Sequence, residues 1–101
     1  MDQRLSNRDQ ATRPARLRPS LDVVGQRMGE AAILIHLQTN QIYELNRTGA
    51  RFWDLLVAGL DREAIVQQLL QEYGVDTAQV VAEVDALLSA LLAAGLIHVE
   101  H

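Results

Sequence analysis

The spacing of hydrophobic residues changes near the middle of the chain, from the alternation typical of strands to the period of about 3.6 residues typical of helices. Before residue 46, short apolar runs are separated by polar or glycine-containing segments. Gly25–Glu30 contains two glycines and is predicted to be a loop, and Gln38–Asn40 is predicted to be a tight turn in which Asn40 tolerates a positive φ. The predicted strands are Ser20–Val24, Ala31–Leu37 and Gln41–Leu45.

Polar residues mark the ends of the helices that follow. Asn46 and Asp61 can each accept a hydrogen bond from a backbone N–H group of the first helical turn. Asp76 can start the last helix and form a capping box with Gln79, three residues further on. The predicted helices run from about Arg47 to Ala58, from Asp61 to Tyr73 and from Thr77 to Ala94, and Gly59, Gly74 and Gly95 end them.

The last helix has an apolar surface wider than the ~100° that a surface helix usually buries. Two adjacent stripes make up this surface, Val80, Val84, Leu87 and Leu91 in one and Val81, Leu88 and Leu92 in the other. Glu83 and Asp85 flank its two sides. The pattern is typical of a helix that packs on two neighbours, and it also suits a helix that lines a groove with acidic residues on the rim. Both interpretations can hold together.

The order β-β-β-α-α-α predicts an α+β fold that is winged-helix-like, with a three-stranded antiparallel sheet followed by three helices. Residues 20–99 would form this domain, with Trp53 as a core anchor and the short apolar segment Leu96–Val99 packing back onto it. Met1–Pro19 has few large apolar residues and five Arg. We therefore predict that it is a flexible Arg-rich tail.

Composition and charge exclude several classes of function. Because the chain has no cysteine, disulfides, thiolate metal sites and cysteine nucleophiles are excluded. Residues 1–20 hold five Arg and two Asp (+3), and the remainder holds four Arg and eleven acidic residues (−7), which argues against nucleic acid as the partner of the domain. The three histidines lack the spacing of a metal site, and no catalytic motif appears. We expect a cytoplasmic, non-enzymatic protein with no cofactor and no membrane segment.

Several segments, taken in order, resemble the PqqD family. They are Ile42–Asn46 (IYELN), Arg47–Leu56 (RTGARFWDLL), the helix that ends at Glu72–Gly74 (EYG), and Glu83–Ile97 (EVDALLSALLAAGLI). The resemblance covers about Ser20 to Ile97. Within the family, the sequence of Thr48–Trp53 is most similar to that of the stand-alone recognition proteins of lasso-peptide systems.

This resemblance implies a protein that binds the leader segment of a ribosomally made precursor peptide and delivers it to a leader protease and a cyclising enzyme. The leader would lie as an added strand beside Gln41–Leu45, in a cleft against the helix Thr77–Ala94. An open sheet edge can bind an extended peptide in this way. The predicted peptide-binding residues are Gln41, Ile42, Tyr43, Glu44 and Leu45 on the strand, and Val80, Val81, Val84, Asp85 and Leu88 on the helix.

Two alternatives stay open at this point. One is a PqqD-type peptide chaperone in the biosynthesis of a quinone cofactor. The other is a winged-helix module for protein interaction or transcription, which would be retained on DNA at low salt. Two side chains also have two interpretations each. Glu44 either pairs with a basic leader residue or is an exposed strand acid, and Tyr43 packs either on the leader or on the helical layer.

Overall fold

A computed structural model describes residues 16–74 and 76–100 of the 101-residue chain. Its elements are, in chain order, β1 (Arg16–Pro19), β2 (Val23–Met28), β3 (Ala31–His36), β4 (Ile42–Leu45), α2 (Arg47–Val57), α3 (Arg62–Tyr73), α4 (Thr77–Ala93) and β5 (Ile97–Glu100). The predicted α+β class and the order of three strands and three helices are confirmed. The comparison with winged-helix proteins stays a prediction.

The three-stranded sheet is antiparallel with the order β2-β3-β4, so β2 and β4 are its two edges. The predicted hairpin between β3 and β4 is confirmed, and Asn40 has the expected positive φ of 59° in its turn. On β3 the side chains of Ala32, Leu34 and His36 point inward and are buried. The inner face of the sheet therefore packs on α2, which follows β4 directly.

The first predicted strand was placed too early. Ser20–Asp22 is not part of a strand, and Val23 and Val24 are the first residues of β2. Gly25–Met28, predicted to be part of a loop, belongs to β2 and pairs with β3 along its whole length. The prediction was wrong because Gly25 was interpreted as a loop residue. A Cβ at Gly25 would lie 3.0 Å from Nε1 of Trp53, so this position of the strand needs a residue without a side chain. Gly29, with a φ of +64°, makes the actual turn.

The first and last described segments form a second, two-stranded sheet that the sequence did not indicate. β1 pairs antiparallel with β5, with Arg16 opposite Glu100 and Pro19 opposite Ile97. Arg16–Pro19 therefore belongs to the fold and not to the predicted tail, whose other residues, 1–15, lie outside the described residues. The expected return of the C-terminal segment is confirmed, because Leu96 and Ile97 are each only 2% exposed.

Two of the three predicted helix caps form. The Asn46 side chain accepts a hydrogen bond from the Gly49 N–H, and the Asp61 side chain accepts one from the Ala64 N–H, each at 2.9 Å. Asp76 precedes α4 but makes no side-chain capping bond, so the predicted capping box with Gln79 is wrong.

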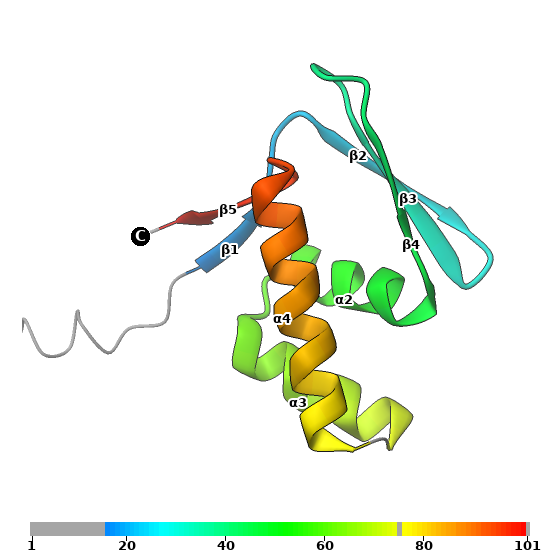
Figure 1. Ribbon diagram of the computed structural model, residues 1–101, viewed down its shortest axis with the longest axis vertical. Helices are drawn as coiled ribbons and strands as arrows, with labels where there is room; N and C mark the ends of the chain where they lie inside the picture. The colour runs from blue at the N-terminus through cyan, green and yellow to red at the C-terminus, as the bar shows by residue number, and fades with distance from the viewer. Residues whose placement is uncertain (1–15, 75, 101) are drawn as a thin grey trace, which may run out of the picture.

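The core is shared by α2, α3, α4, the inner face of the sheet and the segment before β5. The largest fully buried side chains come from every layer: Leu34 from β3, Phe52 and Leu56 from α2, Ile65 and Leu69 from α3, Val84 and Leu91 from α4, and Leu96 just before β5. Trp53, at 8% exposure, is the core anchor that the sequence predicted. In Figure 1 the β1–β5 pair and the three-stranded sheet lie on either side of the C-terminal end of α4.

Candidate functional site

The outer edge of β4 presents unpaired backbone groups. The His36 N–H donates to the Gln41 carbonyl at 2.9 Å, which fixes the alternation of the antiparallel pair. The N–H and C=O groups of Tyr43 and Leu45 consequently face β3. Those of Ile42 and Glu44 face away from the sheet, where no described strand pairs with them.

A cavity of about 400 Å³ lies beside this edge, between β4 and α4. Tyr43 forms its β4 side, and Leu87 with two alanines forms much of its α4 side, so the groove is partly apolar and wide. The lining residues are Tyr43, Asn46 and Thr48 on one wall and Glu83, Ala86, Leu87 and Ala90 on the other. The open edge of β4 and the groove therefore lie on the same surface of the protein.

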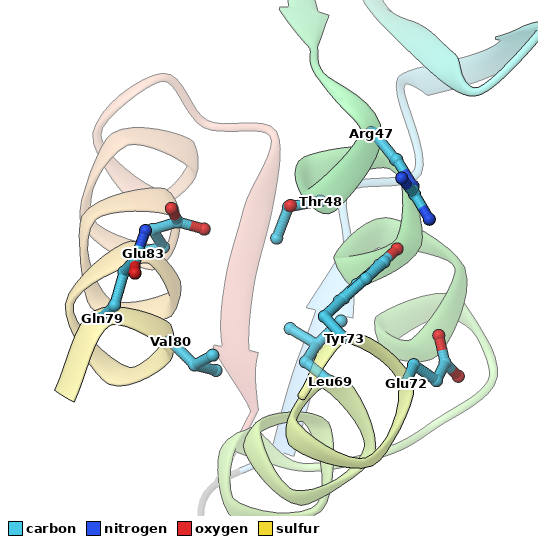
Figure 2. Close-up of a pocket in the computed structure, with 8 residues that line it drawn as sticks. All are labelled: Arg47, Thr48, Leu69, Glu72, Tyr73, Gln79, Val80 and Glu83. Carbon is cyan, nitrogen blue, oxygen red and sulfur yellow. The ribbon is translucent and has the colours of Figure 1, made fainter. Parts of the chain in front are cut away.

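A second cavity of about 390 Å³ extends this groove past the end of β4. It shares Thr48 and Glu83 with the first cavity, so the two cavities are adjacent. Figure 2 shows Gln79, Val80 and Glu83 of α4 on one wall, facing residues from the start of α2 and from α3. The buried side chains of Leu69 and Val80 form an apolar floor.

Charged side chains around the second cavity differ in whether they are already paired. Arg51 binds Glu72 with its Nη2 atom 2.7 Å from Oε2, and this contact holds the pKa of Glu72 at about 2. The Arg47 guanidinium lies over the Tyr73 ring, 5.1 Å from its centroid. Glu83 has no ion-pair partner within residues 16–74 and 76–100, so its carboxylate can bind a cation in the groove.

The Arg51–Glu72 pair predicts a pH dependence of stability. Hydrogen bonds from Arg51, and then from Gln68, lower the pKa of Glu72 from 4.5 to about 2. A carboxylate with a lowered folded-state pKa stabilises the fold above the unfolded value, and this contribution is lost as the pH falls toward 2. Both side chains are partly exposed, so we expect Glu72→Gln to cost at most about 1 kcal/mol near neutral pH.

The measurement is urea denaturation of wild type and Glu72→Gln at pH 6, 4 and 2.5. The difference in unfolding free energy should shrink across this series. Glu63→Gln is the matched control, because the Glu63 side chain is 77% exposed and should contribute little at any pH. A difference that stays constant down to pH 2.5 would contradict the assigned cause.

The strand residues that the sequence proposed as peptide-binding lie in different environments in the structure. Tyr43 is half-buried and lines the groove, while Leu45, at 3% exposure, belongs to the core. Ile42 and Glu44 turn their side chains to the outer face of the sheet, so their contribution to the groove edge is the backbone. Gln41 is exposed just before β4.

On α4, most of the residues that the sequence proposed as peptide-binding lie away from the groove, and Val80 is the exception. Val84 is fully buried, and Val80 is buried in the floor of the second cavity. Asp85 faces α3, where Arg62 binds it through Nε at 2.8 Å and lowers the pKa of its carboxyl group. Val81 and Leu88 share that side of the helix with Asp85 and are half-buried. Helical spacing groups Glu83, Leu87 and Ala90, which was the available signal for the groove side.

Two further properties concern the described residues only. Residues 16–74 and 76–100 include no helix that is long and apolar enough to cross a membrane. The same residues contain no group of three or more His, Asp or Glu side chains placed to hold a metal ion.

The family model described as "Coenzyme PQQ synthesis protein D (PqqD)" matches residues 31–97, about two thirds of the chain. The chain belongs to the PqqD family. The match runs from the start of β3 to the start of β5, so it includes both walls of the groove. This confirms the resemblance that the sequence segments indicated. Among curated proteins, none matches this PqqD-family chain.

Two solved structures share the fold of this PqqD-family chain. One is described as "TbiB1 in Complex with the TbiA(beta) Leader Peptide"; it is 33% identical, with a TM-score of 0.76, over 80% of this chain and 94% of the other. The second is described as "Lasso peptide synthetase B1 complexed with the leader peptide" and is 21% identical, with a TM-score of 0.75, over 83% and 99% of the two chains. Both were solved with a leader peptide bound.

Proposed function

We propose that this chain binds the leader segment of a ribosomally made precursor peptide and delivers the precursor to processing enzymes without catalysing a reaction itself. The observation that carries the proposal is the open β4 edge beside the groove against α4. The 33% identity to TbiB1, solved with the TbiA(beta) leader, supports the same class of ligand. The sequence of Thr48–Trp53, which resembles the recognition proteins of lasso-peptide systems, favours a lasso peptide as the precursor, whose processing needs a leader protease and a cyclising enzyme.

The geometry explains how an extended leader would be held. Backbone groups of Ile42 and Glu44 would continue the sheet onto the leader. Side chains alternate between the two faces of a strand, so every second leader side chain would enter the groove between Tyr43 and Leu87. Apolar contacts in the groove would supply most of the affinity. Glu83 would favour a leader with a basic residue close to the junction of the two cavities.

A second function is favoured by the description of the family model itself. That description concerns coenzyme PQQ synthesis, so a peptide chaperone for a quinone-cofactor precursor is the alternative. It would use the same β4 edge and groove. The two functions differ in the peptide that binds, and therefore a binding experiment separates them.

The test is a fluorescence-polarisation titration of the full chain with the labelled leader encoded beside its gene. We expect saturable binding with a dissociation constant of about 1 μM or lower, which corresponds to roughly 8 kcal/mol. A scrambled leader and a random DNA duplex are the controls. Equal binding of the scrambled peptide, or binding to DNA alone, would rule out leader recognition. Preference for a quinone-precursor peptide would favour the alternative.

A further inference from the structure

The second edge of the sheet also borders a cavity. A space of about 480 Å³ lies between the inner face of β2 and α2, on the sheet edge opposite to β4. The Leu37 N–H donates to the Asp22 carbonyl at 2.8 Å, so the backbone groups of Val23, Gly25 and Arg27 point away from β3. These three residues also line the cavity. At β2, as at β4, unpaired backbone groups of an edge strand therefore lie beside a groove.

One polar group beside this cavity has no partner among the described residues. Trp53 is only 8% exposed, and its Nε1–H donates to no acceptor within the described part of the chain. In that part, no side-chain nitrogen or oxygen is both fully buried and unpaired. The indole N–H is therefore accessible from the cavity, beside Gly25, which has no side chain to cover it.

The remaining walls show what kind of group fits. Arg27 and Asp54 are already paired, with Nη1 3.0 Å from Oδ2, so they offer no free charge to a small ionic ligand. Val57, 56% exposed, and Val23 add apolar surface. The free groups are thus a strand edge, one accessible N–H donor of a largely buried Trp and an apolar wall. An extended polypeptide with a backbone carbonyl for Trp53 and an apolar side chain for Val57 matches all three.

We propose that the β2 edge and the cavity beside Trp53 form a second binding site, which takes an extended segment of the enzyme that processes the bound precursor. This inference rests on the proposed function, since a delivery protein has to contact its enzyme while it holds the leader. Because β2 and β4 are opposite edges of one sheet, both sites can be occupied at the same time. Delivery then proceeds through a ternary complex of leader, carrier and enzyme.

The test uses the full chain labelled with 5-fluorotryptophan, which places one fluorine probe at its single Trp. The labelled leader and the purified leader protease encoded beside the gene are added separately. We expect the protease to shift the fluorine resonance of Trp53 and the leader to leave it nearly unchanged. A resonance that the protease does not move would overturn the proposal.

Variants then locate the contact. Val57→Glu should weaken protease binding at least tenfold in calorimetry while leader affinity stays within twofold of wild type. Trp53→Phe keeps an aromatic ring but removes the N–H donor, so the affinity for the protease should fall several-fold. The matched control is Leu92→Glu on α4, an exposed leucine (40%) that lines neither site; it should change neither affinity.

Three other outcomes are decisive. Equal protease binding by Val57→Glu and wild type would place the enzyme elsewhere. A wild-type dimer that Val57→Glu converts to a monomer in light scattering would assign the cavity to a second copy of this chain, against the proposal. If the wild-type protein does not bind the leader but the protease still shifts the fluorine resonance of Trp53, the proposed function is ruled out and the second site stands.

Discussion

Replacing Glu44 with proline is expected to weaken leader binding more than tenfold while the helices remain folded. Proline has no backbone N–H, and the N–H of residue 44 points to the open side of β4. Each ladder bond contributes about 0.5–1.5 kcal/mol net, and the proline ring also hinders the approach of the peptide backbone. The measurement is the polarisation titration with the cognate leader, with circular dichroism to confirm helix content.

Two variants act as controls for this experiment. Glu44→Ala removes the carboxylate but keeps the backbone N–H, so its affinity should stay close to that of wild type unless a basic leader residue pairs with Glu44. Tyr43→Pro removes a donor that faces Leu34 in β3, and should therefore lower the unfolding free energy as well as binding. Tight leader binding by a folded Glu44→Pro protein would show that the peptide does not pair with β4.

The second large effect should come from filling the groove on α4. Ala86 is exposed and lies on the α4 wall opposite Tyr43. Ala86→Trp would occupy much of the approximately 400 Å³ cavity, and we expect it to reduce leader affinity at least tenfold. Stability should change little, because the new side chain replaces no buried contact and Trp costs under about 0.7 kcal/mol of helix propensity relative to Ala.

The matched control is Ala78→Trp, the same substitution at an exposed position of α4 that lines neither groove cavity. Both variants should have melting temperatures close to that of wild type, and only Ala86→Trp should lose the leader. If Ala86→Trp binds the leader as tightly as Ala78→Trp does, the peptide does not occupy the groove between β4 and α4.

Local sequence signals located the helices because each signal acts within one turn. Asn46 and Asp61 cap α2 and α3 as expected, since an N-cap side chain needs only a backbone N–H three residues away. The same reasoning failed at Asp76, whose side chain makes no such bond. The β3–β4 hairpin was equally predictable, because its alternation and its Asn40 turn are contained in about fifteen residues.

Long-range contacts decided the parts that the sequence missed. Gly25 indicated a loop, yet it lies in β2 and pairs with β3, and the close approach of Trp53, far along the chain, explains why this strand position holds a glycine. β1 and β5 are near opposite ends of the chain, and neither four-residue segment carries a pattern that identifies the other as its partner. Pairing of this kind depends on where the helices bring the chain ends.

The sequence by itself determined the fold class, the family resemblance and the β4 strand, because propensity, capping and alternation are local properties. It also determined which α4 residues share a side of the helix. Only the tertiary structure decided which neighbour each side meets: Asp85 meets Arg62 of α3, and Glu83, Ala86 and Leu87 line the groove beside β4. Helical periodicity fixes the angles between side chains but not the orientation of the helix in the core, which the packing of the whole domain sets.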